Sequence, residues 1–425
     1  MQPKVLSSAP VVATQAACPS TRIDHQWVKS IDQIDEQIWD LCFGRENVKQ
    51  SYALQKATER TGLADVTFHY LLVKQAGVTN AIFPCFEFKI SLINVASLWI
   101  NKLVSAMRRV FPHFLYLRMF IIGTPVSICQ DLFGIRPDID LSTANHILAA
   151  ACDVAIARAE ELGIGLVIVK EITSRLLPQV HVVLQSRFTL AESPATTYLY
   201  VGESGAGSYR ARLRTKYRAV MNTRLRNFSD AGLRWETHTD FAKYAKSMHA
   251  LYLQVLLRSK VRFEELTPEF FVQVSEQLGE NAFAQLCFDG DRLVACALVL
   301  QDKLRTHPMY LGMDDAYRDK ASLYYNCIYK VIDVVERSEQ PIVQLGQTSY
   351  TAKAAIGAVV DRLYVGVRHR NRLLNLIISR FPDELFPPTI IPRQQRVFRD
   401  VDSNNQALRR YHVTFEEIPG DNRVD

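Results

Sequence analysis

The feature that most constrains the fold is a strand–loop–helix–strand pattern in the last third of the chain. Residues 309–313 form a short apolar stretch, residues 314–320 a polar loop, and residues 342–346 a second buried-strand pattern. Behind Ser322, a candidate N-cap, apolar residues recur at helical spacing: Leu323, Cys327, Val331 and Val335. A helix that connects two strands is typical of α/β proteins. The loop–helix junction can also bind an anion, because free backbone N–H groups point outward there.

Length and composition favour a globular protein with two domains. The chain has 425 residues, 48% of them hydrophobic and 22% charged, which excludes a disordered protein. The net charge of +6 permits an anionic ligand such as a nucleotide or tRNA but does not require one.

The spacing of the cysteines and the lengths of the apolar runs indicate the cellular compartment that we expect. None of the eight cysteines forms a Cys-x-x-Cys pair, and several lie in apolar runs, so we expect reduced thiols in a cytoplasmic protein. The ten histidines show no metal-ligand spacing, and we predict no metal site. We expect neither a signal peptide nor a transmembrane segment, since no apolar run is long enough.

The order of predicted elements occurs twice along the chain. Residues 68–86 and 282–300 each read as two strands around a turn, and residues 145–169 and 323–345 each read as a helix followed by a strand. This internal repeat predicts two similar α/β units in tandem.

Other segments give single predictions. Residues 30–62 have helical spacing, residues 180–184 and 197–201 resemble strands, and His307 is predicted to lie in a turn ahead of Pro308. Residues 90–122 are apolar with interspersed bases. They predict buried core with a helix or, alternatively, an interfacial segment that contacts a membrane peripherally.

The most basic segment lies between the two units. A glycine-rich turn at residues 202–207 precedes a predicted helix, and from Arg210 to Arg226 there are seven bases and no acid. An ordinary exposed helix mixes charges of both signs, so this run favours contact with a polyanionic substrate or cofactor, with Arg214 and Arg218 as the preferred residues.

A family resemblance lies in the residues of the second unit. In chain order these are Tyr310, Tyr317, Leu323, Tyr324, Tyr325, Gln344, Leu345, Gly346, Tyr350, Lys353, Gly357 and Ala358. The basic helix adds Tyr209, Leu213, Lys216 and Arg218. Residues 185–390 thereby resemble GNAT-type acyltransferases, in the branch of FemAB-like and CelD-like proteins (the BioF2-like acetyltransferase domain). Members usually carry Gln/Arg-x-x-Gly-x-Gly/Ala before the helix, whereas residues 318–322 here lack the glycines.

The resemblance implies an α/β fold with tandem GNAT-like domains, each a mixed twisted sheet flanked by helices. We predict a flexible tail over residues 1–24, an N-terminal GNAT-like domain over 25–185, a C-terminal acyltransferase domain over 186–400, and a C-terminal tail over 401–425.

Acyl transfer requires a polarised carbonyl, a base for the attacking amine and stabilisation of the leaving group. On the resemblance, we expect a cleft where adjacent parallel strands separate. The predicted catalytic residues are Asp314 as base, Tyr317 as acid, and Tyr350. The predicted contacts of the co-substrate are Arg318, Lys320, Ser322, Arg214 and Arg218. The predicted substrate contacts are Gln347, Lys353 and Tyr310.

The function expected from these residues is N-acyl transfer from a thioester donor, acyl-CoA, to an amine of a small-molecule substrate. No cofactor is expected to be bound permanently. One alternative is a FemAB-like transferase that uses aminoacyl-tRNA to form an amide bond. A second alternative is a GNAT-fold protein that binds a ligand without catalysis.

Overall fold

The computed structural model describes residues 23–91, 116–202, 208–259, 264–338 and 340–415. The predicted N-terminal tail, most of the segment 90–122, the glycine-rich turn and the last ten residues therefore lie wholly or largely outside the described residues. Among the helices of the described residues, none combines the length and apolarity that crossing a bilayer requires.

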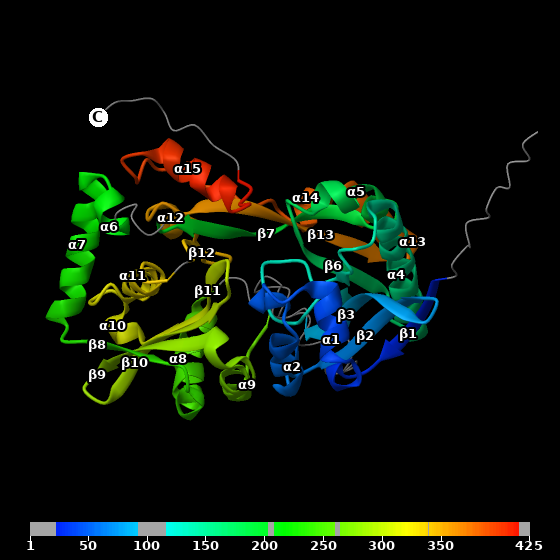
Figure 1. The fold of residues 1–425 in the computed structure, drawn as a ribbon, viewed down its shortest axis with the longest axis horizontal. Coiled ribbons are helices and arrows are strands. Elements are labelled where there is room, and N and C mark those ends of the chain that lie inside the picture. The colour runs from blue at the N-terminus through cyan, green and yellow to red at the C-terminus, as the bar shows by residue number, and fades with distance from the viewer. Residues whose placement is uncertain (1–22, 92–115, 203–207, 260–263, 339, 416–425) are drawn as a thin grey trace, which may run out of the picture.

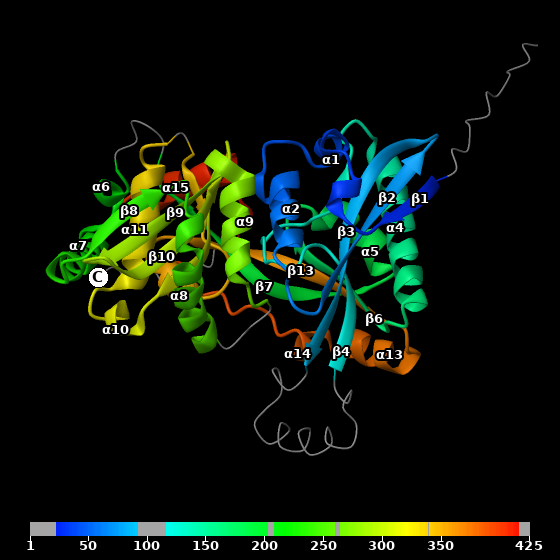
Figure 2. The same cartoon turned by 90° about the horizontal axis from the view of Figure 1, so that it is seen from below.

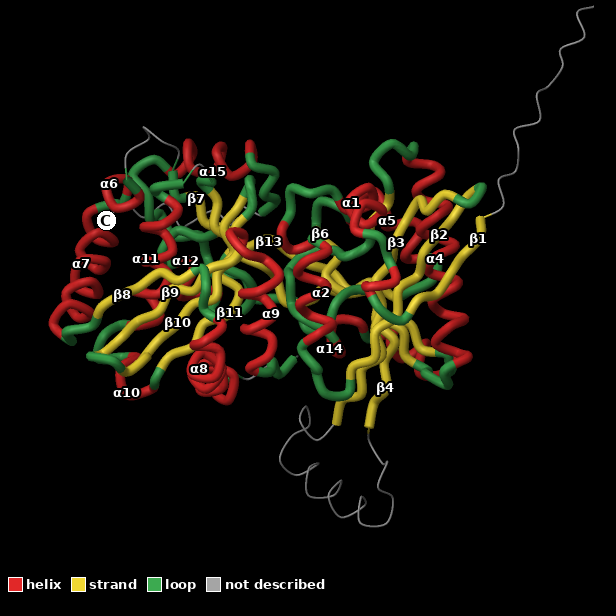
Figure 3. The backbone as a smooth tube through the Cα atoms, turned by 60° about the horizontal axis from the view of Figure 1, so that its bottom comes forward, coloured by secondary structure: helices red, strands yellow, loops and turns green. Residues whose placement is uncertain are grey.

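One mixed sheet of thirteen strands runs through the molecule in the order β1-β2-β3-β4-β6-β13-β7-β12-β11-β10-β9-β8, with β5 paired to β3. Figures 1 and 3 show it extending through both halves of the chain, with helices packed along it. The strands are β1 (Ile23–Val28), β2 (Val66–Gln75), β3 (Val78–Ser91), β4 (Tyr116–Ile122), β5 (Gly134–Ile135), β6 (Leu166–Thr173), β7 (Thr189–Tyr200), β8 (Arg234–His238), β9 (Ala282–Asp289), β10 (Arg292–Gln301), β11 (Arg305–Met313), β12 (Ile342–Gln344) and β13 (Val359–His369).

The helices flank this sheet. They are α1 (Glu36–Phe43), α2 (Tyr52–Arg60), α4 (Leu141–Glu161), α5 (Leu177–Gln185), α6 (Tyr209–Arg212), α7 (Thr215–Asp230), α8 (Ala245–Arg258), α9 (Pro268–Leu278), α10 (Asp315–Arg318), α11 (Leu323–Val335), α12 (Tyr350–Ala354), α13 (Arg372–Arg380), α14 (Pro382–Leu385) and α15 (Val401–Arg410).

The internal repeat is confirmed by the topology. β2 and β3 form an antiparallel hairpin, as do β9 and β10. β4 is parallel to β6 across α4, and β11 is parallel to β12 across α11. Each half therefore contains a hairpin, a third strand, a crossover helix and a parallel fourth strand, which is the predicted tandem arrangement.

Two long strands join the halves. β7 pairs with β13 over most of its length, from Thr189 to Tyr198, and with β12 at its end, while β13 also pairs with β6 of the first half. Figure 1 shows both strands crossing the centre of the molecule. The predicted boundary between residues 185 and 186 lies between α5 and β7. The halves nevertheless exchange strands, so β13 extends the first half's sheet although it lies within the second predicted domain.

The prediction of a tail from residue 401 is wrong for the described part. α15 begins at an Asp400 cap, and its Ala407 and Leu408 are buried against Tyr198 and Ile342 of β7 and β12. Burial of these side chains stabilises a short helix that its polar composition alone does not favour.

Three other expectations need correction. Residues 30–62 form two separate helices, because Gly44 adopts φ 76° and ends α1. Residues 180–184 belong to α5 and not to a strand, since Pro178 lies in its first turn, where proline is favourable. His307 lies within β11 and is buried, so it is not a turn residue.

Alternating residues of β10 define the two faces of the second half. Cys296, Leu298 and Leu300 pack with α8 and α9, whereas Ala297 and Val299 pack with α11. α8 and α11 therefore cover opposite faces of the sheet.

Candidate active site

The parallel strands β11 and β12 separate soon after they begin. Only Arg305 and Thr306 of β11 pair with β12, opposite Ile342 and Val343, although β11 continues to Met313. The register with β10 shifts so that Met309 is an extra residue, which makes it a β-bulge. The backbone of β11 beyond Thr306 consequently has no strand partner on the β12 side.

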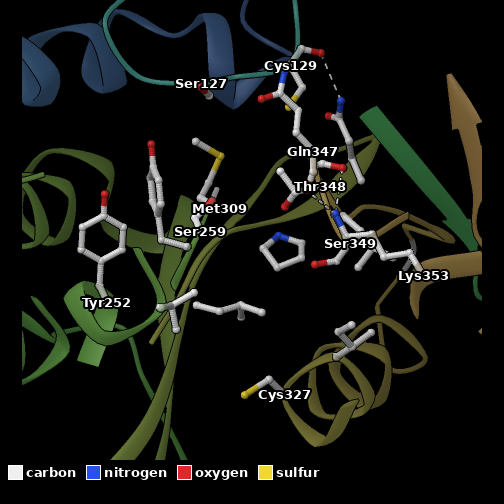
Figure 4. A pocket seen from close by; sticks show the side chains of 18 of the residues that line it. Ser127, Cys129, Tyr252, Ser259, Met309, Cys327, Gln347, Thr348, Ser349 and Lys353 are labelled. Carbon is white, nitrogen blue, oxygen red and sulfur yellow. Dashed lines mark hydrogen bonds between the residues drawn. The ribbon is translucent and has the colours of Figure 1, made fainter. Parts of the chain in front are cut away.

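A cavity of about 250 Å³ occupies this gap. Its walls come from α8 and α11, which lie on opposite faces of the sheet, so the cavity crosses the sheet between the separated strands. Figure 4 shows Tyr252 and Met309 on one side, Cys327 below, the loop at residues 347–349 on the other side, and Ser127 and Cys129 above.

The α8 side of the cavity is polar and is organised by the Glu264 carboxylate. Its Oε1 accepts hydrogen bonds from the Ser127 backbone N–H at 3.1 Å and from the Tyr310 hydroxyl at 3.1 Å, and its Oε2 accepts one from Ser127 Oγ at 3.2 Å. Burial, and then the neighbouring Glu264, raise the pKa of Tyr310 well above its ordinary value, so this phenol stays protonated as a donor.

The α11 side is mostly apolar, with Leu311, Cys327, Ile328 and Val331 in the wall. Tyr324 is the polar exception: burial raises the pKa of its hydroxyl to about 12, against a hydrogen bond with Ser349 that lowers it. An apolar channel with one protonated hydroxyl suits an acyl chain or a thioester arm better than a charged group.

The loop after β12 is held by Lys353 of α12. Its Nζ donates to the carbonyl oxygens of Gly346 at 3.0 Å and Gln347 at 2.6 Å. Burial lowers the pKa of this amine to about 7, against a smaller opposing effect of Cys129. Thr348 and Ser349 both have positive φ, which turns the loop sharply at the cavity wall.

The first half of the chain closes the cavity from above. Lys49 is buried, and its Nζ donates to the Ile128 carbonyl at 2.6 Å and to Gln344 Oε1 at 2.8 Å. Gln344 Nε2 in turn donates to the Cys129 carbonyl at 3.2 Å. The buried Glu171 carboxylate accepts hydrogen bonds from the backbone N–H groups of Ile128 and Cys129. These bonds fix residues 127–129 at the end of β12.

The structure brings three predicted substrate contacts together, since Tyr310, Gln347 and Lys353 all line the cavity. Gln347 donates to the Pro194 carbonyl at 2.8 Å, which anchors the loop to β7. Tyr350 lies one residue beyond the lining loop and donates to the Ala195 carbonyl at 3.0 Å. Their roles in binding or catalysis stay predictions.

Asp314 and Tyr317 lie elsewhere. Asp314 caps α10 through the Ala316 N–H at 2.9 Å and pairs with Arg292, while the Tyr317 hydroxyl donates to Asp289 at 2.5 Å. Neither is among the described residues that line the cavity. The capping role follows from the residue type, because aspartate at a loop–helix junction satisfies free N–H groups.

The predicted co-substrate contacts fall into two groups. Arg318, Lys320 and Ser322 surround the start of α11, where Ser322 adopts φ 49° and makes no capping hydrogen bond. Arg214 and Arg218 lie on α7. Asn227 of α7 contacts Ser322 at 3.1 Å, and Arg224 contacts Tyr329, so α7 runs antiparallel to α11. Arg214 and Arg218 therefore lie toward the far end of α11, and the structure does not join the two groups.

The sequence did not indicate several residues of the cavity: Lys49, Ser127, Cys129, Tyr252 and Glu264. Tyr324 entered only through the family resemblance, without a role in the site. Glu264 stands beside Glu265 in a polar connection, where a single carboxylate carries no pattern. Lys49 and Ser127 come from the other half of the chain, so no spacing within the second unit reveals them.

Comparisons with known proteins give a sequence family for part of the chain and similar folds for most of it. Residues 215–348 match the sequence family described as the acetyltransferase (GNAT) domain, whereas no curated protein matches the chain. The chain is similar in structure to FemX, with 10% identity, a TM-score of 0.50, and coverage of 83% of this chain and 99% of that one. A tandem GNAT protein from the clavulanic acid biosynthesis pathway has 10% identity, a TM-score of 0.47, and coverage of 82% and 99%.

Residues 215–348 are therefore a GNAT acetyltransferase domain. The fold is a mixed α/β arrangement with a repeated unit, and it is similar to the fold of FemX.

Proposed function

We propose that the chain transfers an acyl group from acyl-CoA to an amine of a small molecule within the cavity between β11 and β12. The observation that carries the proposal is the cavity's passage through the sheet, with polar groups on the α8 side and an apolar channel on the α11 side. The donor can then enter from one face of the sheet, and the acceptor amine can reach the donor's carbonyl carbon from the other face.

In this proposal Glu264 is the general base. The acceptor nitrogen attacks the thioester carbonyl, the C–N bond forms, and its excess proton passes to the Glu264 carboxylate, which Tyr310 and Ser127 hold in place. The C–S bond breaks as the tetrahedral intermediate collapses, and the thiolate takes a proton from the Tyr324 hydroxyl on the α11 side. The unpaired edge of β11 beyond Thr306 can stabilise the oxyanion.

The start of α11 is where we place the donor's phosphates. It offers Arg318 and Lys320 together with backbone N–H groups that Ser322 does not cap. Arg318 is already paired with Asp319, so we expect Lys320 and the backbone to make the larger contribution. Gln347 and Lys353 would contact the substrate from the loop after β12.

Aminoacyl-tRNA is the second candidate donor. The observation in its favour is the exposed basic side of α6 and α7, where Arg210, Arg214, Lys216 and Arg226 are all exposed and no acid occurs between Arg210 and Arg226. A polyanion could follow this surface, whereas a single CoA would need only the start of α11.

Two finer expectations stay proposals. A cytoplasmic location is supported by the seven described cysteines, which are all free and buried. Peripheral membrane contact through residues 90–122 concerns mainly residues outside the described part, while the described part forms the end of β3 and the whole of β4 within the sheet.

The deciding experiment combines binding and turnover. Purified protein is titrated with CoA, acetyl-CoA and aminoacyl-tRNA at low and moderate salt, and the melting temperature is followed. We expect CoA and acetyl-CoA to raise it, and acetyl-CoA with a panel of primary amines to release free thiol. A shift with aminoacyl-tRNA alone, lost as salt rises, would replace the thioester donor by the second candidate. No shift and no turnover with any donor would overturn the proposal.

A further inference from the structure

Helix α13 turns an apolar surface toward solvent. It follows β13 and contains Leu373, Leu374, Leu376 and Ile377, all of which are exposed, with Leu373 at 65% and Leu376 at 62%. None of the residues of α13 is buried. A surface helix normally directs such side chains inward, where their burial is favourable.

The same surface continues beyond the helix. Leu373, Leu376 and Ile377 follow one another at spacings of three and one, which places them on one side of α13, and Phe381 comes directly after the helix. Phe381, between α13 and α14, and Leu385, the last residue of α14, are exposed as well. Only Ile378 and Phe386 turn inward, onto Ala191, Val365 and Val367 of the sheet. We call the outward set, Leu373, Leu376, Ile377, Phe381 and Leu385, the α13 face.

Positive charge borders the α13 face. From Gly366 to Pro382 the chain contains four arginines, at 368, 370, 372 and 380, and no acidic residue. Arg370, Arg372 and Arg380 are exposed. Two exposed acids of α14, Asp383 and Glu384, lie between Phe381 and Leu385 in sequence, so the positive charge borders the part of the face that α13 contributes. Exposed leucine, isoleucine and phenylalanine flanked by arginine is the composition of helices that lie in the interface of an anionic bilayer.

We propose that the α13 face docks the protein peripherally on an anionic lipid surface, with its apolar side chains among the acyl chains and its arginines among the phosphates. A second copy of the chain fits the face less well. A two-fold contact through α13 would bring Arg372 and Arg380 of both copies together, and like charges at an interface are unfavourable. Figure 2 shows α13 and α14 at the lower edge of the molecule, on the same side as the ends of β3 and β4.

The test is sedimentation with vesicles. The full-length chain is mixed with vesicles of phosphatidylcholine alone, or of phosphatidylcholine with phosphatidylglycerol, at low and high salt. We expect sedimentation with the anionic vesicles and much less with the neutral ones, reduced as salt rises.

The variant Leu376→Glu/Ile377→Glu should lower the partition coefficient at least tenfold without changing the melting temperature, because both side chains are already exposed. The matched control is Val182→Glu on α5, an apolar side chain that is 73% exposed on a helix away from the α13 face, and it should sediment like the wild type.

Three outcomes would overturn the proposal. The first is no sedimentation of the wild type with anionic vesicles. The second is equal sedimentation of the double variant, which would assign the contact to another segment such as residues 92–115. The third is a concentration-dependent dimer, seen by analytical ultracentrifugation, that the double variant dissociates while vesicles have no effect.

Discussion

The two halves of the molecule share an order of elements, but their parallel strand pairs differ in how far the two strands stay paired. In the first half β4 and β6 stay paired over four residue pairs, from Met119 with Leu166 to Ile122 with Val169. Lys170 then lies against Gly123, and its Nζ donates to the carbonyl oxygens of Thr124 at 2.9 Å and Val126 at 3.2 Å. In the second half β11 and β12 keep two pairs and then separate around the cavity.

The difference teaches that the repeated topology alone does not create a site. In the first half, the aliphatic chain of Lys170 fills the space beyond β4 and β6, and two hydrogen bonds hold its amine in place. In the second half the bulge at Met309 and the loop after β12 leave that space open. Lys353 there holds its own loop and leaves the gap free.

The strongest test of this contrast is Glu264→Gln, which removes the proposed base while retaining the shape of the side chain. We expect kcat for acyl transfer to fall by about 10² to 10⁴, the usual contribution of a positioned general base. Thiol release from acetyl-CoA with an amine acceptor measures it. The exposed neighbour supplies the matched control: Glu265→Gln should keep wild-type turnover, and an equal loss in both variants would contradict the assignment.

Substituting one cysteine in each half compares an open space with a filled one. Cys327→Phe extends into the cavity, so we expect acetyl-CoA affinity to drop at least tenfold with a small change in stability. Cys152→Phe enters the close-packed core under α4, where overpacking costs about 1–3 kcal/mol of unfolding free energy. Calorimetric titration and urea unfolding measure the two effects. Equal destabilisation by both substitutions would show that the second gap is not open.

Lys353 predicts a pH dependence. With its pKa near 7 in the folded chain and 10.5 as the ordinary value, the unfolded chain binds more protons between these two pH values, so stability from this group rises with pH across that window. Below about pH 7 the buried amine is charged, and its burial is unfavourable.

Lys353→Met removes this titration. The melting temperature of the variant relative to the wild type should therefore be higher at pH 6 than at pH 9. Lys320→Met, at an exposed position, serves as control and should show the same difference at both pH values. If the melting temperature of Lys353→Met differs from that of the wild type by the same amount at pH 6 and pH 9, the Lys353 amine stays charged at both pH values.

Lys170→Met should affect the first half alone. It leaves the Thr124 and Val126 carbonyl oxygens without their donor, which costs about 1–3 kcal/mol in unfolding free energy. Acyl-transfer turnover should not change, because Lys170 is not among the described residues lining the cavity. Loss of turnover with wild-type stability would place a functional group in the first half.

The smallest effects are expected at Asp314 and Tyr317. Asp314→Asn and Tyr317→Phe keep side-chain shape, and both residues are engaged with partners outside the cavity, so turnover should change less than about threefold. A loss comparable with that of Glu264→Gln would return the catalytic roles to the residues that the sequence suggested.

The sequence by itself determined the element order, the internal repeat and the position of the second strand pair, because hydrophobic periodicity and turn residues act locally. It also indicated Tyr310, Gln347 and Lys353, since all three lie in or beside the two strands that separate. The sequence predicted a base at Asp314 and a strand at residues 180–184, where the structure has a helix cap and a helix, because such short polar or apolar runs fit either role.

Only the tertiary structure decided which groups meet in the cavity. Glu264 reaches it because the Ser127 segment of the other half supplies two hydrogen bonds to its carboxylate. Lys49 joins Gln344 across 295 residues of chain, and β7 and β13 exchange between the halves. Contacts of this kind depend on packing between segments that are distant in sequence, and no local pattern of residues encodes them.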